Sequence, residues 1–189
     1  METAVIILIV LLSLFAILGM YDGFYLHIFK YKLYEHNESR KEHVTHTIRG
    51  ILFPCILYCC YLANGNTWFV LGLLILAADI IVTVVDAYME GDSRSFMGGL
   101  PRGEYIIHLL VNGFHFAAIA VFIVAKVELS EIGFMLTENI SNAPSYPAFI
   151  LLVKNLIPGA FLMASLHVLV AIPKTATYWN LIRNKITCC

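Results

Sequence analysis

Residues 67–90 read TWFVLGLLILAADIIVTVVDAYME, an apolar run of transmembrane length that carries three acidic residues. A helix needs roughly 20 mostly apolar residues to cross a bilayer, and this run supplies them. Asp79, Asp86 and Glu90 are separated by seven and four residues, so a helix places all three on one face. Ionisable groups inside a span are costly unless they are paired or functional. The run therefore predicts a membrane helix with one acidic face directed at the protein interior.

The whole chain has the composition of a membrane protein. Its 189 residues are 60% hydrophobic and 13% charged, with a mean hydropathy of +0.80, whereas soluble domains are about 25% charged. We expect an all-α integral membrane protein, a single membrane domain over residues 1–189, with a kink or break at Pro158-Gly159. An amphipathic segment at about 21–40 is expected at the inner interface. The expected spans are 3–24, 45–63, 67–88, 105–126 and 148–172.

Lysine and arginine residues predict the orientation of these spans. With the N-terminus outside, the inner segments contain ten of these residues and the outer segments contain only Lys126. Because inner loops are enriched in positive charge, we expect a multi-pass protein with its N-terminus outside and its C-terminus in the cytoplasm, in the cell membrane if the chain is bacterial. The net charge of −1 gives no basic surface for nucleic acid. The closing Cys188-Cys189 is a candidate for lipidation.

A second polar stripe lies on the span at 105–126. Its members, Glu104, His108 and His115, are separated by four and seven residues and so share a helix face. The third and fourth spans are antiparallel, so the two stripes should mirror each other in depth. The pairs expected at matching depth are Glu90 with Glu104, Asp86 with His108, and Asp79 with His115.

A weak internal repeat relates the first two spans to the next two. The pattern Arg-x-Glu-x-x-x-His occurs at 40–46 and again at 102–108, and an aspartate precedes each, Asp22 or Asp86. Arginine at the inner surface and glutamate in a first helical turn are common in membrane helices. Only the histidines and the aspartates therefore exceed this expectation. The parallel hairpin repeats would be residues 1–62 and 67–126.

The residue types predict a metal centre. Carboxylate and imidazole groups on facing helices suit iron, manganese or zinc, as in di-metal carboxylate bundles, although those bundles space Glu and His at i, i+3 and this chain spaces them at i, i+4. The preferred ligands are His43, His46, Asp79, Asp86, His108 and His115, with Asp22, His27, Glu90 and His167 as weaker candidates. The candidates for catalytic roles are Glu42, Glu104 and Arg49, the two glutamates either as ligands or as groups that orient imidazoles.

This centre predicts a metal-dependent enzyme whose site lies near the inner headgroup level and acts on a lipid or another apolar substrate. Iron would favour oxidation, with an electron-donor protein as partner, and zinc would favour hydrolysis. One or two ions fit the number of candidate ligands. The HExxH, HxxxH and HxxHH boxes are absent, so the simplest zinc protease and the familiar desaturase patterns do not apply.

Three alternatives fit the same residues. In the first, pairs among His46, His108, His115 and His167 bind a b-type haem for electron transfer, although the many acids have no ready role beside a haem iron. In the second, the acid and histidine chain is a relay in a proton or metal-ion transporter. In the third, the polar stripes only form hydrogen bonds between helices.

Overall fold

The computed structural model describes residues 1–131 and 133–187, and Cys188 and Cys189 lie outside them. The chain is almost entirely helical, with one short β-hairpin. The elements are α1 Glu2–Met20, the π-helical η1 Tyr21–Lys30, α2 Arg40–Ile56, the π-helical η2 Leu57–Leu62, α3 Asn66–Ser93, η3 Ser95–Met97, α4 Arg102–Lys126, β1 Val127–Ser130, β2 Gly133–Leu136, η4 Asn139–Asn142, α5 Tyr146–Ala171 and α6 Pro173–Thr187.

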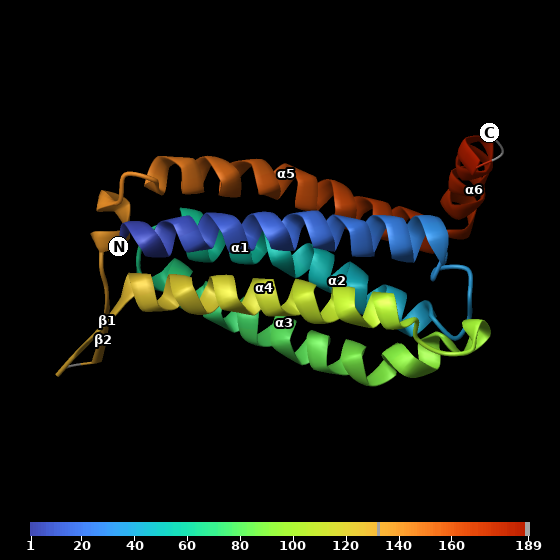
Figure 1. The fold of residues 1–189 in the computed structure, drawn as a ribbon, viewed down its shortest axis with the longest axis horizontal. Coiled ribbons are helices and arrows are strands. Elements are labelled where there is room, and N and C mark those ends of the chain that lie inside the picture. The colour runs from blue at the N-terminus through green and yellow to red at the C-terminus, as the bar shows by residue number, and fades with distance from the viewer. Residues whose placement is uncertain (132, 188–189) are drawn as a thin grey trace.

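Five helices are long and apolar enough to cross a membrane, as the sequence predicts. They lie side by side in one elongated bundle, with the N-terminus at one end and the C-terminus at the other (Figure 1). Gly65 and Gly98 lie in two of the polar breaks between spans, with φ angles of +99° and +84°, a region that favours glycine. The outward faces carry large exposed apolar side chains, for example Leu74, Ile81 and Leu162, as a lipid environment requires.

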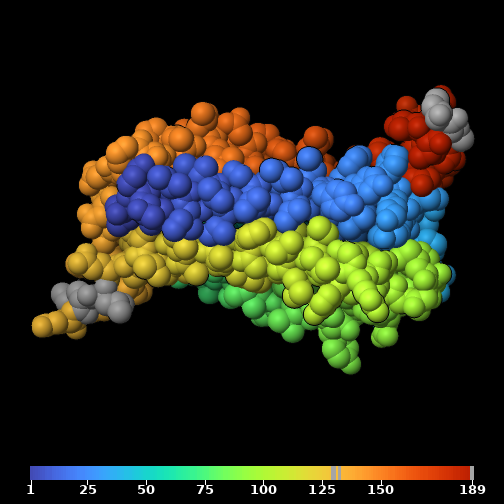
Figure 2. Space-filling model, in the orientation of Figure 1, coloured from blue at the N-terminus to red at the C-terminus, as the bar shows by residue number. Residues whose placement is uncertain are grey.

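The close helix pairs cross between the two proposed hairpin repeats. α1 packs along α4 and α2 packs along α3, while α5 packs along α2 and α1. Figure 2 shows the surfaces of α1 and α4 in contact along much of their length. Exchanging the two hairpins converts the α1–α4 pair into the α3–α2 pair. The helix pairing is therefore compatible with the internal repeat.

The two halves of the bundle bury different side chains. The apolar half, which ends at the N-terminus and the β-hairpin, contains a core built around Leu8, Leu12, Phe122 and Phe149. The polar half ends at the loop of residues 94–101 and buries acids, histidines and an arginine. The candidate site therefore belongs to the polar half.

Three features differ from the sequence-based expectation. Residues 21–30 continue α1 as η1 and pack against α4, where Asp22 contacts His108, so the amphipathic segment expected over about 21–40 is helical only as far as Lys30. The helix α5 continues through Pro158 and Gly159 without a break, since one missing backbone hydrogen bond is tolerated within a membrane bundle. The helix across the end of the bundle is α6, which runs at a steep angle to the other helices (Figure 1).

Candidate metal centre

The polar half encloses a group of ionisable side chains that we call the polar cluster. η1 supplies an aspartate and a histidine. α2 and α4 each supply a glutamate and a histidine near their first turns. The end of α3 supplies two acids, and the arginine that follows its last residue belongs to the same group. All are buried except one partly buried histidine, His46. The members are Asp22, His27, Glu42, His46, Asp86, Glu90, Arg94, Glu104 and His108.

Three side chains bring candidate ligand atoms to one point. The Nε2 atoms of His27 and His108 are 3.3 Å apart, and they lie 3.3 and 3.0 Å from Oδ1 of Asp22. Ligands about 2.0–2.2 Å from one tetrahedral ion lie roughly 3.3 Å from each other. Oε1 of Glu104, 3.3 Å from Nε2 of His27, adds a fourth candidate. These four residues form the first ligand group, in which the three distances among Asp22, His27 and His108 match that spacing. The guanidinium of Arg94 also contacts Oε1 of Glu104 and lies 3.3 Å from Nε2 of His27.

Glu90 orients the imidazole of His108. Nδ1 of His108 forms a hydrogen bond with Oε1 of Glu90. A neutral imidazole that donates from Nδ1 has a lone pair on Nε2, and here that lone pair faces Oδ1 of Asp22, which is also an acceptor. Two facing acceptors need a proton or a cation between them. The same carboxylate–histidine arrangement fixes metal-ligating imidazoles in metalloproteins.

A second ligand group adjoins the first. Nε2 of His46 has no hydrogen-bond partner among the described residues and lies 3.3 Å from Oδ2 of Asp86 and 3.6 Å from Oε1 of Glu42. Thr45 donates to the other oxygen of Asp86, which leaves Oδ2 directed at His46. The rings of His27 and His46 are nearly perpendicular, with centroids 4.1 Å apart. The two ligand groups are therefore direct neighbours.

Arg94 joins the two glutamates of the repeated sequence pattern. Its guanidinium group is fully buried and binds both oxygens of Glu42, at 2.6 and 2.8 Å. It also donates from Nε to Oε1 of Glu104 at 3.0 Å, and Oε2 of Glu104 has no partner within the described chain. From the sequence, Arg94 counts only as a positive charge of an inner loop. Arg94 lies four residues after Glu90, so extending the acidic stripe of α3 by one helical turn would have placed Arg94 on the same helix face.

The acids pair crosswise between the two hairpin repeats. Asp22, from the first hairpin, lies 3.0 Å from His108 of the second, and Asp86, from the second, lies 3.3 Å from His46 of the first. Each ligand group therefore contains residues from both hairpins. This crosswise pairing also explains why the expected contact between Asp86 and His108 does not form, since each of them has a closer partner elsewhere.

Of the three pairs predicted at matching depth, one is in direct contact. Nε2 of His115 lies 3.1 Å from Oδ2 of Asp79, as expected, and Arg49 donates to Asp79 at 3.3 Å and to Asn112 at 2.8 Å. Among the described residues, Asp79 and His115 fall in none of the groups with metal-ligand geometry. Glu90 and Glu104, another of the three pairs, have different partners. Glu90 contacts His108, and Glu104 contacts Arg94 and His27.

His43 and His167 form a separate stacked pair. Their ring centroids are 5.1 Å apart, and Nε2 of His43 donates to the backbone carbonyl of His167 at 3.0 Å. Nδ1 of each ring has no partner in residues 1–131 and 133–187. The described structure thus places these two predicted candidates beside the polar cluster and outside its ligand groups.

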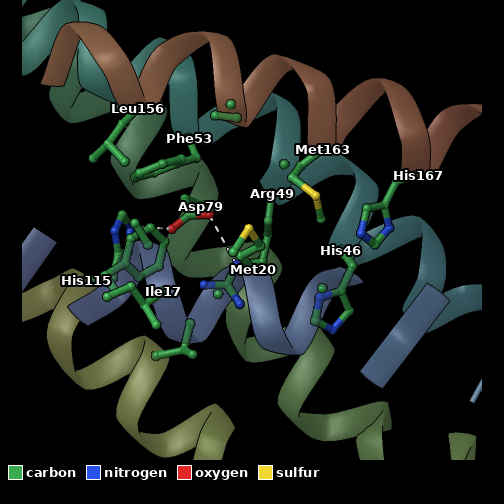
Figure 3. Close-up of a pocket in the computed structure, with 18 of the residues that line it drawn as sticks. Ile17, Met20, His46, Arg49, Phe53, Asp79, His115, Leu156, Met163 and His167 are labelled. Carbon is green, nitrogen blue, oxygen red and sulfur yellow. Dashed lines mark hydrogen bonds and ion pairs between the residues drawn. The ribbon is translucent and has the colours of Figure 1, made fainter. Parts of the chain in front are cut away.

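A cavity of about 360 Å³ adjoins the second ligand group and lies between α1, α2 and α5. In Figure 3, His46 and His167 lie at one end, Phe53, His115 and Leu156 lie at the other, and Arg49 and Met20 lie between them. Most of the wall is apolar. The volume falls within the range of small-molecule sites, roughly 300–1,000 Å³.

Comparisons of the chain with family models, with curated proteins and with solved structures find no match.

Proposed function

We propose that this protein is a membrane-embedded, metal-dependent enzyme that acts on a lipid or another apolar substrate. The observation that carries the proposal is the triangle formed by Asp22, His27 and His108, whose three ligand atoms converge at 3.0–3.3 Å. Glu90 supports it by holding His108 in the orientation that frees Nε2.

The charge of the polar cluster supports the same proposal. Its five carboxylates face one buried guanidinium, that of Arg94, which leaves four negative charges without a permanent positive partner in the cluster. Unpaired buried charge is costly in a region that lipid surrounds. Two divalent cations, one in each ligand group, would neutralise the cluster while the imidazoles stay neutral and bind the metal. We therefore propose two neighbouring metal positions.

The mixture of imidazole and carboxylate ligands suits iron or zinc. With iron the proposed reaction is an oxidation, which requires an electron-donor protein as partner, and with zinc it is a hydrolysis by an activated water. The substrate proposal rests on the cavity, because its mostly apolar wall adjoins His46 of the second ligand group. Glu42 and Glu104 act as ligands or orient them while Arg94 holds both in place.

The proposed orientation places the polar half in the cytoplasmic leaflet, with the N-terminus outside. The support is the distribution of lysine and arginine along the chain. Trp179 and Tyr178 on α6 lie at the same end, where aromatic residues favour the membrane interface.

The haem and transport alternatives have less support. Of the histidines that could bind a haem, His46, His108 and His115 each face a carboxylate, at 3.3, 3.0 and 3.1 Å, and a carboxylate has no ready role beside a haem iron. For a transporter, the polar groups should continue through the bundle, whereas the apolar half is filled by a hydrocarbon and aromatic core. Ion flux in proteoliposomes that is abolished by Asp79→Asn would favour the transport alternative.

Elemental analysis and an absorption spectrum of the protein purified in mild detergent test the proposal. We expect stoichiometric iron or zinc and no Soret band. His108→Ala should remove the metal of the first ligand group, and Glu90→Gln should weaken the affinity of that position by about 10–100-fold because it acts through the orientation of His108. Glu90→Gln also keeps the bulk of the side chain, so a folded variant is expected.

His36→Ala is the matched histidine control. His36 stacks on Phe96 at 3.8 Å, outside the polar cluster, and its replacement should leave the metal content unchanged. Purified protein that carries no metal and binds none on reconstitution would contradict the proposal. Equal metal content in wild type and both cluster variants would exclude the first ligand group.

A further inference from the structure

The cavity beside His46 opens sideways, toward the region that lipid would occupy. Its rim includes Ile17 and Met20 of α1, which are 61% and 59% exposed, and Gly159 of α5, which is also exposed. A Cβ placed on Gly159 has no neighbour within 4 Å among the described residues. The boundary between α1 and α5 thus offers a lateral opening at a point where glycine, having no side chain, leaves space.

The two ends of the cavity are lined by different side chains. At one end, Nε2 of His46 and Nδ1 of His167 find no hydrogen-bond partner in the described parts of the chain, and the side chain of His46 belongs to the second ligand group. At the other end, the rings of Phe15 and Phe53 pack with centroids 4.7 Å apart, and Phe15 lies 4.9 Å from the ring of His115. Seven residues of α2 separate His46 from Phe53, a rise of about 10 Å. We call the end with His46 and His167, next to the second ligand group, the polar end. The opposite end is closed by the rings of Phe15 and Phe53, with His115 and its partner Asp79 beside them.

The position of the polar end matches the way a lipid lies in a bilayer. The end of the bundle near His46 also carries the cross-lying α6 with Tyr178 and Trp179, as expected for the headgroup level. An amphiphile that slides between α1 and α5 would bring its head to His46 and direct its chain toward Phe53. A volume of about 360 Å³ lies near the lower limit for ligand sites, which favours one chain over two.

From these features we propose that the cavity binds a single-chain amphiphile with an oxygen-bearing head, taken laterally from the membrane between α1 and α5. The head lies beside His46 and the second ligand group, and the chain ends against Phe15 and Phe53. This inference rests on the proposed metal-dependent function and assigns its substrate class. It also means that chemistry takes place at the head or the first carbons of the chain, because these are the atoms nearest the ligand groups.

Photolabelling of the full-length protein in nanodiscs tests this proposal. The probes are a long-chain fatty alcohol and a long-chain fatty acid, each with a diazirine at the end of the chain, and the labelled peptides are identified by mass spectrometry. We expect labelling around Phe15, Phe53 and Leu156, where the chain would end, and competition by the unlabelled alcohol or acid. Gly159→Phe should fill the opening and lower this labelling at least about tenfold.

Gly113→Phe is the matched control. Gly113 is exposed on α4 and does not line the cavity, and a Cβ at this position would meet no described atom within 4 Å, so the same change in bulk should leave labelling unaltered. Even labelling of all outward helix faces, or equal labelling in Gly159→Phe and Gly113→Phe, would overturn the inference. Metal content measured on the same samples separates the two proposals. Labelled, metal-free protein contradicts the metal centre alone, and metal-loaded protein without specific labelling contradicts the lateral site alone.

Discussion

In the apolar half, α1 packs Val5, Leu8 and Leu12 against the neighbouring helices, whereas its continuation η1 buries Asp22 and His27 in the polar half. One continuous run of helix thus changes from hydrocarbon contacts to ionisable contacts. Lipid tails are as apolar as leucine, so packing and not the hydrophobic effect holds the apolar half together. The polar half instead needs charge compensation, because its groups are withdrawn from water. The contrast supports the proposal that the polar half carries the function and that the apolar half supports it.

The largest expected effect comes from removing the buried cation of the polar half. Arg94→Met keeps much of the side-chain length but leaves Glu42 and Glu104 without their guanidinium partner. Breaking a buried ion pair on one side costs about 3–5 kcal/mol. Thermal unfolding in detergent should therefore show a large loss of stability. Arg102→Met, at an exposed position, is the control and should change little, and equal stability of both variants would break the contrast between the halves.

Removal of the proposed metal should have the next largest effect. A ligand at about a hundred times its Kd stabilises the folded state by about 2.7 kcal/mol. Chelation should lower the unfolding temperature of the wild type, and added iron or zinc should restore it. His108→Ala should show a smaller chelator effect than the wild type, because it already lacks a ligand of the first group while the second group is intact. A chelator effect of the same size in His108→Ala would show that any stabilising metal binds elsewhere.

A steric change in the apolar half should cause the third largest loss of stability. A Cβ on Gly72 would lie 2.5 Å from Sγ of Cys60 and 3.2 Å from Cβ of Cys59, so Gly72→Ala must push α3 away from η2. Overpacking of this kind costs about 1–3 kcal/mol. The unfolding temperature of Gly72→Ala should fall while its metal content stays constant. Gly113→Ala, with open space around it, should change neither quantity. Loss of metal in Gly72→Ala would show that the two halves are mechanically coupled.

The smallest effect is expected where α6 docks on the polar half. The hydroxyl of Tyr34 donates to the side chain of Asn180 at 2.8 Å. Asn180→Ala should cost about 1 kcal/mol, the net contribution of one hydrogen bond. Limited proteolysis should then cut α6 more readily, while the stability of the five-helix bundle is almost unchanged. A global loss of stability as large as that of Arg94→Met would mean that α6 is part of the core.

The spans were predictable because length and hydropathy are local properties of the sequence. The contact between Asp79 and His115 was also predictable, since it follows from helix periodicity and antiparallel depth. The partners of Asp86 and His108 were not, because periodicity fixes a helix face but does not say which of several helices that face meets. Arg94 was missed for a related reason: an arginine at a helix end is expected to be solvated, and only the fold shows that two glutamates enclose it.

The crosswise exchange of aspartates has a consequence for biogenesis. Neither half of the chain contains a complete set of ligands, so the first hairpin enters the membrane with Asp22 and Glu42 lacking the partners that α3 and α4 will bring. The first proposed metal position therefore becomes complete only when the fourth helix brings Glu104 and His108, and the second only when the third helix brings Asp86. For the same reason, two separately expressed fragments, divided in the turn at Gly65, should acquire metal only after they associate.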